Sequence, residues 1–175
     1  YIERSAESQE SIYYACGETV EKIELLPQCD AVKEKGYEVL YLTENVDEFM
    51  VQIIRDYEGK SFKSVQEGDL DLESEEEKKE AEEKAEALKG FLTFVKESLG
   101  DSVKEVRLSS NLGSHPVCMT PEAGMSFEME KYMKKANPEF AFSVGRILEL
   151  NAEHSAVQAL QRAMTEDPVK AKDYA

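Results

Sequence analysis

The sequence is poor in positive charge and in long apolar runs, and each shortage excludes a class of protein. Its 21 Lys and Arg residues stand against 37 Asp and Glu residues, which gives a net charge of −16. This charge disfavours nucleic acid and anionic membranes as partners. No apolar run approaches the roughly 18 residues of a membrane span, and no signal peptide opens the chain. We therefore expect a soluble, cytoplasmic protein.

Cysteines are too few and too scattered for a disulfide framework or a zinc knuckle. Cys16, Cys29 and Cys118 lie far apart, and none belongs to a C-x-x-C pair. His115 is three residues from Cys118, but a zinc site needs about four ligands and no others cluster there. We predict reduced packing residues and no metal site.

Phosphate-binding motifs are also missing. The chain contains no G-x-G-x-x-G and no complete G-x-x-x-x-G-K-[ST]. Gly17, which precedes a helical stretch, and Thr43, at the end of a predicted strand, nevertheless lie where α/β folds place ligands. These two positions support the alternative that the chain is a small α/β enzyme, although no catalytic residue stands out.

Residues 12–65 alternate between strand-like and helix-like patterns. Apolar runs predict strands at 12–16, 39–42 and 61–65, with a helical stretch between the first two that Pro27 kinks or splits. Because the run 39–42 is apolar without alternation, it favours a parallel sheet covered by helices. We therefore predict a small α/β/α unit with a mostly parallel sheet.

The helix after residue 43 carries an apolar stripe that we expect to cover this sheet. Its N-cap is predicted at Asn45 or Thr43. Phe49 lies about 60° from the centre of the stripe, beside the polar Gln52, and is either a core-edge aromatic or a contact residue with its ring partly in water. The stripe consists of Val46, Met50, Ile53, Ile54 and Tyr57.

Residues 66–86 change the composition sharply, with eleven acidic residues against three lysines. Ser74 and Glu77 have the spacing of a capping box, which predicts a helix that continues to Gly100. The alternating stretch 103–108 then favours a strand with one wet face and antiparallel neighbours. With strands near 116–119 and 146–150 and further helices, the second part is predicted as an α+β domain with a short, mainly antiparallel three-stranded sheet.

One stretch, residues 124–136, reads as an amphipathic helix that opens at Thr120-Pro121-Glu122. Methionine is unbranched and polarizable, so a methionine-rich face suits a surface that binds many partners, but a stripe at this spacing also suits packing on the protein's own core. Both interpretations remain open from the pattern alone. The apolar face consists of Met125, Met129, Tyr132, Met133 and Ala136.

Four long segments, in collinear order over essentially the whole chain, resemble the ninety-kilodalton heat-shock chaperone family, in its bacterial high-temperature protein G form. The segments are YIERSAESQESIYYACG, KGYEVLYLTENVDEFMVQIIRDYEGKSFKSV, KEVRLSSNLGSHPVCMTPEAGMSFEMEKYMKK and ILELNAEHSAVQAL. The resemblance implies a fragment of an ATP-driven, homodimeric chaperone. Residues 1–67 would end the middle domain, and residues 68–175 would form the C-terminal domain without its final dimerisation helices.

By resemblance, unfolded or partly folded client proteins bind a methionine-rich helix and a nearby aromatic. Carried over by position, the client-binding residues are Met125, Met129, Tyr132, Met133, Glu48, Phe49 and Gln52. Family members often have Trp at Phe49 and an aliphatic residue at Tyr132, and either change would narrow or weaken client binding. ATP, magnesium and contacts with co-chaperones belong to the full-length parent, so we expect no cofactor and no enzymatic activity in this fragment.

Three functions therefore compete. A client-binding chaperone fragment predicts an exposed methionine face, and an enzyme predicts a pocket near Gly17 and Thr43 with perturbed titrating groups. A purely structural dimerisation module predicts a buried methionine face. Because the first reading combines residue pattern and resemblance, we expect Met125, Met129, Tyr132 and Met133 to be substantially exposed.

Overall fold

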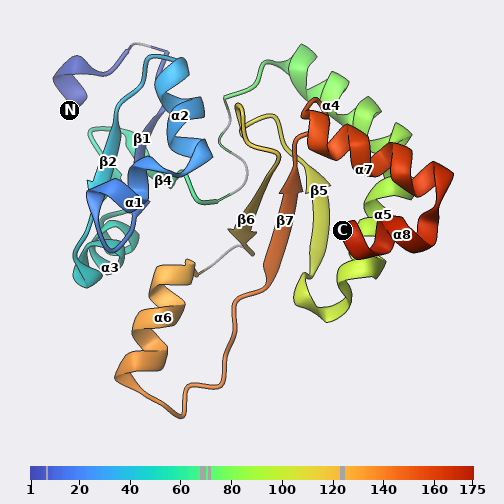
Figure 1. Cartoon of the computed structure of the whole chain (residues 1–175). Helices are drawn as coiled ribbons and strands as arrows, with labels where there is room; N and C mark the ends of the chain where they lie inside the picture. Colours follow the sequence, from blue (N-terminus) through green and yellow to red (C-terminus); the bar gives the residue numbers. More distant parts are fainter. Residues whose placement is uncertain (7, 68–69, 71, 123–124) are drawn as a thin grey trace. The chain divides into compact units, whose positions relative to one another are not determined.

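The computed structural model describes residues 1–6, 8–67, 70, 72–122 and 125–175. The chain divides into two compact units (Figure 1). The first unit comprises Tyr1–Leu72 and Pro121–Val144, and the second comprises Glu73–Thr120 and Gly145–Ala175. The segment that carries the predicted methionine helix therefore groups with the N-terminal residues, although the domain boundary predicted after residue 67 would assign it to the other part.

The first unit contains a four-stranded sheet in the order β2-β1-β4-β3. Strand β1 pairs in parallel with both β2 and β4, whereas β3 pairs antiparallel with β4. These pairings confirm the mostly parallel sheet. The strands are β1 (Ser11–Cys16), β2 (Val39–Leu42), β3 (Asp56–Tyr57) and β4 (Lys60–Ser64).

Alternate side chains of β1 enter two separate cores, as the two-residue period of a strand requires. Tyr13 and Ala15 pack with Ile23, Cys29 and Val32 from α1 (Val20–Glu24) and α2 (Pro27–Glu34). Tyr14 and Cys16 pack with Val51 from α3 (Asn45–Ile54). Pro27 begins α2, so the predicted split of the first helical stretch is confirmed. The first unit thus has the predicted α/β/α layering.

The side of helix α3 that faces the sheet differs from the one predicted from the sequence. The stripe that was expected to cover the sheet is exposed, with Val46 66 % and Ile53 80 % accessible, while Val51 and Glu48 are buried. Apolar residues occupy most of this helix's circumference, so periodicity could not select the packed side. The N-cap is Glu44, not Asn45 or Thr43, because Glu44 and Asp47 form a capping box.

The second unit contains a three-stranded sheet in the order β5-β7-β6, with helices against it. Val106 and Leu108 of β5 share an apolar core with Leu148 and Leu150 of β7 and with residues of α5 and α7. The elements are α4 (Glu75–Ala87), α5 (Lys89–Leu99), β5 (Glu105–Leu108), β6 (Val117–Pro121), β7 (Arg146–Leu150), α7 (Ser155–Glu166) and α8 (Pro168–Tyr174). This mixture of helices and short strands confirms the predicted fold class.

One detail of this sheet was predicted wrongly. Strand β5 pairs with β7 in parallel, with Arg107 opposite Glu149, whereas an antiparallel neighbourhood was expected. Strands β6 and β7 point in opposite directions, so the sheet is mixed (Figure 1). Alternation indicates one buried and one wet face, which is commoner in antiparallel sheets but does not fix the direction of a neighbouring strand.

Local sequence signals predicted some helix termini correctly and others wrongly. The capping box at Ser74 and Glu77 is confirmed, and Gly100, with φ 55°, ends α5. The expected single helix is nevertheless divided at Leu88. Asn151 was predicted to cap α7, but His154 does so by accepting a hydrogen bond from the Ala156 amide.

Candidate client-binding site

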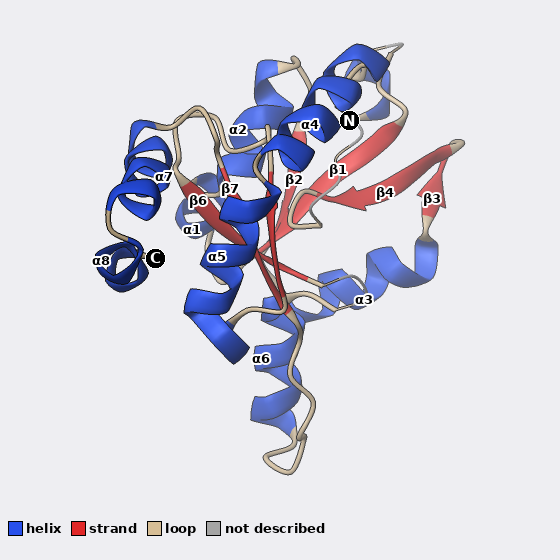
Figure 2. Cartoon of the chain, turned by 90° about the vertical axis from the view of Figure 1, so that its right-hand side faces the viewer, coloured by secondary structure: helices blue, strands red, loops and turns tan. Residues whose placement is uncertain are grey.

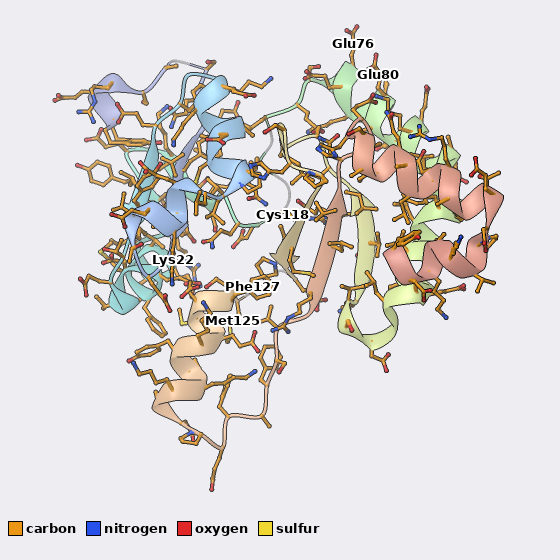
Figure 3. The ribbon with its side chains drawn as sticks, in the orientation of Figure 1. Lys22, Glu76, Glu80, Cys118, Met125 and Phe127 are labelled. Atoms are coloured by element: carbon orange, nitrogen blue, oxygen red, sulfur yellow. The ribbon has the colours of Figure 1, made fainter. Side chains whose placement is uncertain are left out.

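The methionine-rich helix, α6 (Phe127–Ala136), is shorter than its sequence pattern predicted. Ser126 is its N-cap, and the Ser126 Oγ accepts a hydrogen bond of 3.0 Å from the Met129 amide. Pro121 lies in β6, so the predicted opening at Thr120-Pro121-Glu122 is wrong. Gly124, where the pattern begins, is outside the described residues. Met125 precedes the helix and is not part of its face (Figure 3).

Helix α6 packs against α3 within the first unit, and an aromatic pair marks the contact. The rings of Phe49 and Tyr132 meet edge to face, with centroids 5.9 Å apart and planes at 74°. This is the geometry that aromatic quadrupoles favour. Both rings keep more than a third of their surface in solvent. The structure therefore brings together two predicted site residues that are 83 positions apart in the sequence, and leaves both accessible.

Glu48 makes the polar contact between the same two helices. Its Oε2 accepts a hydrogen bond of 2.6 Å from the Ser126 Oγ, at the N-terminus of α6. A carboxylate is favourable at this position because the unpaired amides there carry partial positive charge. Glu48 is only 6 % exposed, so it serves contacts within the unit and is closed to solvent in this arrangement.

Burial raises the pKa of Glu48, and the nearby Glu67 and Glu128 raise it further, while hydrogen bonds from Ser126 oppose the shift. The adjacent Cys16 thiol, on β1, is also buried, and burial together with the charge of Glu48 raises its pKa to about 12. A thiol with such a pKa is protonated and unreactive at neutral pH. This result supports the prediction of Cys16 as a packing residue.

The methionine face is not uniformly exposed, which corrects the sequence expectation. Met129 is buried, with 5 % of its surface accessible, and Met125 and Met133 are half-buried. Tyr132 is 37 % exposed, and Gln52 on α3 is exposed. Met129 lies one turn from the helix start, where Ser126 and Glu48 hold α6 against its own unit. Packing on the protein's own core therefore applies to Met129, and solvent exposure applies to Tyr132.

Salt bridges cover the opposite side of α6. Lys131 pairs with Glu128 at 2.6 Å, and Lys134 pairs with Glu130 and also donates to the Ser143 Oγ. A surface pair such as Lys131 with Glu128 adds only about 0.3–0.5 kcal/mol, whereas Glu130 of the second pair is buried. These pairs place charged groups on this side of α6, where the half-buried Phe127 also lies.

Sequence reasoning missed Ser126 and Cys16 as parts of this junction. Ser126 had a signal, because a serine followed by an acidic first turn is typical of a helix start. Cys16 had none, since only the fold places β1 beside α3 and α6.

Of the two positions proposed for an enzyme site, Gly17 has a packing explanation. A Cβ on Gly17 would lie 2.7 Å from Cγ1 of Ile23, so this glycine permits close packing of α1. Gly59-Lys60-Ser61 carries the last residues of a P-loop motif, but Gly59 lies in the β3–β4 turn and Lys60 and Ser61 begin β4, where a P-loop would begin a helix. An open groove occurs in the second unit instead, where Lys84 and Glu153 form an ion pair at 2.8 Å.

Two absences apply to the part of the chain that the structure describes. None of its helices is long and apolar enough to cross a membrane. Within the same residues, no three Cys, His, Asp or Glu side chains gather where they could hold a metal ion.

Comparison with known proteins gives a consistent family match. Residues 1–175 match the model of the Hsp90 protein family. The chain is 45 % identical over 175 residues to the chaperone protein HtpG of Clostridium acetobutylicum, and 40 % identical over 174 residues to that of Bacillus subtilis. It is 44 % identical over 174 residues to HtpG of Natranaerobius thermophilus. These alignments cover 99–100 % of this chain but only 28 % of each relative's length.

Proposed function

Because the chain belongs to the Hsp90 family, we propose that it is the client-binding part of a longer, ATP-dependent chaperone. In this proposal residues 1–67 end a middle domain and residues 68–175 belong to a C-terminal domain. Nucleotide and magnesium binding, dimer formation and contacts with co-chaperones belong to the longer cytoplasmic protein. The fragment itself contributes binding without catalysis.

The accessible aromatic pair at the α3–α6 junction is the observation that carries this proposal. Phe49 and Tyr132 belong to different helices, contact each other, and remain partly in solvent. Burying such a ring completely would gain on the order of 1.5–3 kcal/mol, so leaving two of them exposed forgoes stability. We name these two residues with Met133 and Gln52 the junction patch, and propose that it contacts exposed apolar segments of unfolded clients.

The remaining predicted residues support this patch from beneath or beside it. Glu48 fixes the start of α6 through Ser126, and Met129 is buried on the same helix. Met125 is half-buried and lies before the helix. In this arrangement Glu48 and Met129 position the client-binding surface rather than touch the client.

The test is a titration of the chain with a fluorescently labelled, permanently unfolded protein, followed by anisotropy. We expect Phe49→Ala combined with Tyr132→Ala to weaken binding about tenfold or more, because aromatic anchors dominate such contacts. Tyr174→Ala is the matched control, since Tyr174 on α8 is also an exposed aromatic, in the second unit. Equal affinity of the double variant and the control variant would contradict the proposal.

A further inference from the structure

Helix α3 has three sides with different surroundings, and one of them is apolar and is not covered by any residue that the structure describes. Val51 packs into the core with Tyr14 and Cys16, while Glu48 and Phe49 meet α6. The remaining side is exposed to solvent. We name it the outer face of α3, and its residues are Val46, Met50, Ile53 and Ile54.

An exposed apolar side of this extent is unusual for a surface helix, which normally turns charged residues to water. Single exposed apolar residues are common, but contiguous patches mark interaction sites. Residues 46, 50, 53 and 54 are three, four or one position apart and therefore form one continuous surface. Phe49 and Ile53 are also four residues apart, so the outer face adjoins the junction patch.

Acidic side chains stand at both ends of the outer face. Glu44 and Asp47 lie at the start of α3, where the Glu44 amide donates to the Asp47 carboxylate. Asp56 and Glu58 follow the helix in the β3–β4 hairpin, which continues directly from its C-terminal end (Figure 2). The basic residues of this region are Arg55 and Lys60, and the Lys60 Nζ donates to the Gln9 carbonyl oxygen. The acidic flanks therefore favour a positively charged ligand, as does the negative net charge of the whole chain.

We propose that the outer face of α3 binds extended apolar client segments that have Lys or Arg on both sides. This inference rests on the proposed chaperone function and adds a sequence preference and a second surface to it. The ten residues of α3 span about 15 Å, a length that about four or five extended residues cover. The apolar core of the segment lies along Val46, Met50 and Ile53, and its basic flanks reach the acidic groups at either end.

The experiment uses the full chain and two synthetic peptides. Each peptide has five apolar residues, flanked on both sides by Arg pairs in one and by Asp pairs in the other. We expect the Arg-flanked peptide to bind at least about tenfold more tightly at low salt, and added salt to reduce this preference by screening. Met50→Ser combined with Ile53→Ser should lower its affinity about tenfold. Val169→Ser is the matched control, because Val169 is an exposed apolar residue of α8.

A charge variant tests the flanks separately. Asp56→Asn combined with Glu58→Asn should reduce the preference for the Arg-flanked peptide about threefold, as expected for exposed charges. Asparagine suits position 58, where φ is 50°. A preference that does not change in this variant would overturn the proposed role of the acidic flanks.

The other outcomes separate this inference from the proposed function. If Met50→Ser/Ile53→Ser binds the peptide normally while the Phe49/Tyr132 variant loses the unfolded protein, the inference fails and the proposed function stands. If the unmodified chain binds neither peptide and no unfolded protein, both fail. If sedimentation shows a dimer that the Met50/Ile53 variant dissociates without any change in peptide affinity, a second copy covers the face and the inference is overturned.

Discussion

Helices α3 and α6 both have amphipathic sequences, but the structure uses their apolar sides in opposite ways. The apolar stripe of α3 was expected in the core, and it is exposed at Val46 and Ile53. The methionine face of α6 was expected in solvent, and Met129 at its centre is buried. The difference shows that hydrophobic periodicity identifies an apolar side without identifying what covers it.

Replacing one methionine on each helix tests this comparison most strongly. Met129→Ser removes a buried apolar side chain and inserts a hydroxyl, so we expect a loss of about 2–5 kcal/mol in the free energy of unfolding. Met50→Ser, on the outer face of α3, should change it by no more than about 0.5 kcal/mol. Urea unfolding of both variants measures the two values. Similar losses in both would mean that α3 and α6 do not differ in the way the structure shows.

How much the sequence could predict depends on whether the signal was local. Pro27 at the start of α2 and the capping box at Ser74 were predictable, because each signal acts within a few residues. The parallel sheet followed from the unbroken apolar run at 39–42. The pairing of Phe49 with Tyr132 followed from family resemblance, because contacts between distant segments leave no periodic signal.

The errors have equally specific causes. The N-cap of α3 was predicted at the wrong residue because Glu is an uncommon N-cap. Glu44 takes this role here by forming a reciprocal pair with Asp47. Strand β5 was given the wrong neighbour direction because alternation reports burial alone. The burial of Glu48 was not foreseen, because its hydrogen-bond partner Ser126 lies 78 positions away. The client-binding roles of all seven candidate residues stay predictions.

The hydrogen bond between α3 and α6 provides the next test, with a smaller expected effect. Ser126→Ala removes the N-cap of α6 and one partner of the buried Glu48 carboxylate. We expect a loss of about 1–2 kcal/mol in the free energy of unfolding. Ser143→Ala, an exposed serine of the same unit that contacts Lys134, should cost less than about 0.5 kcal/mol. An equal effect of both changes would show that the capping contact does not hold α6.

The smallest expected effect is a pH dependence of stability that arises from Glu48 of α3. The folded pKa of Glu48 lies above the 4.5 of an exposed carboxyl, because burial penalises the charged form. Between those two values the folded state binds more protons than the unfolded state, so unfolding free energy falls as pH rises. The contribution of Glu48 is thus fully present below pH 4.5 and is lost as pH rises through its folded pKa.

Glu48→Gln isolates this contribution, because glutamine still accepts the hydrogen bond from Ser126 but does not titrate. Urea unfolding from pH 4 to pH 7 should show a larger loss of stability in the unmodified protein than in the variant. Parallel pH profiles would mean that the Glu48 carboxylate is not desolvated at the α3–α6 contact, and that α6 is held there by Met129 and the aromatic pair alone.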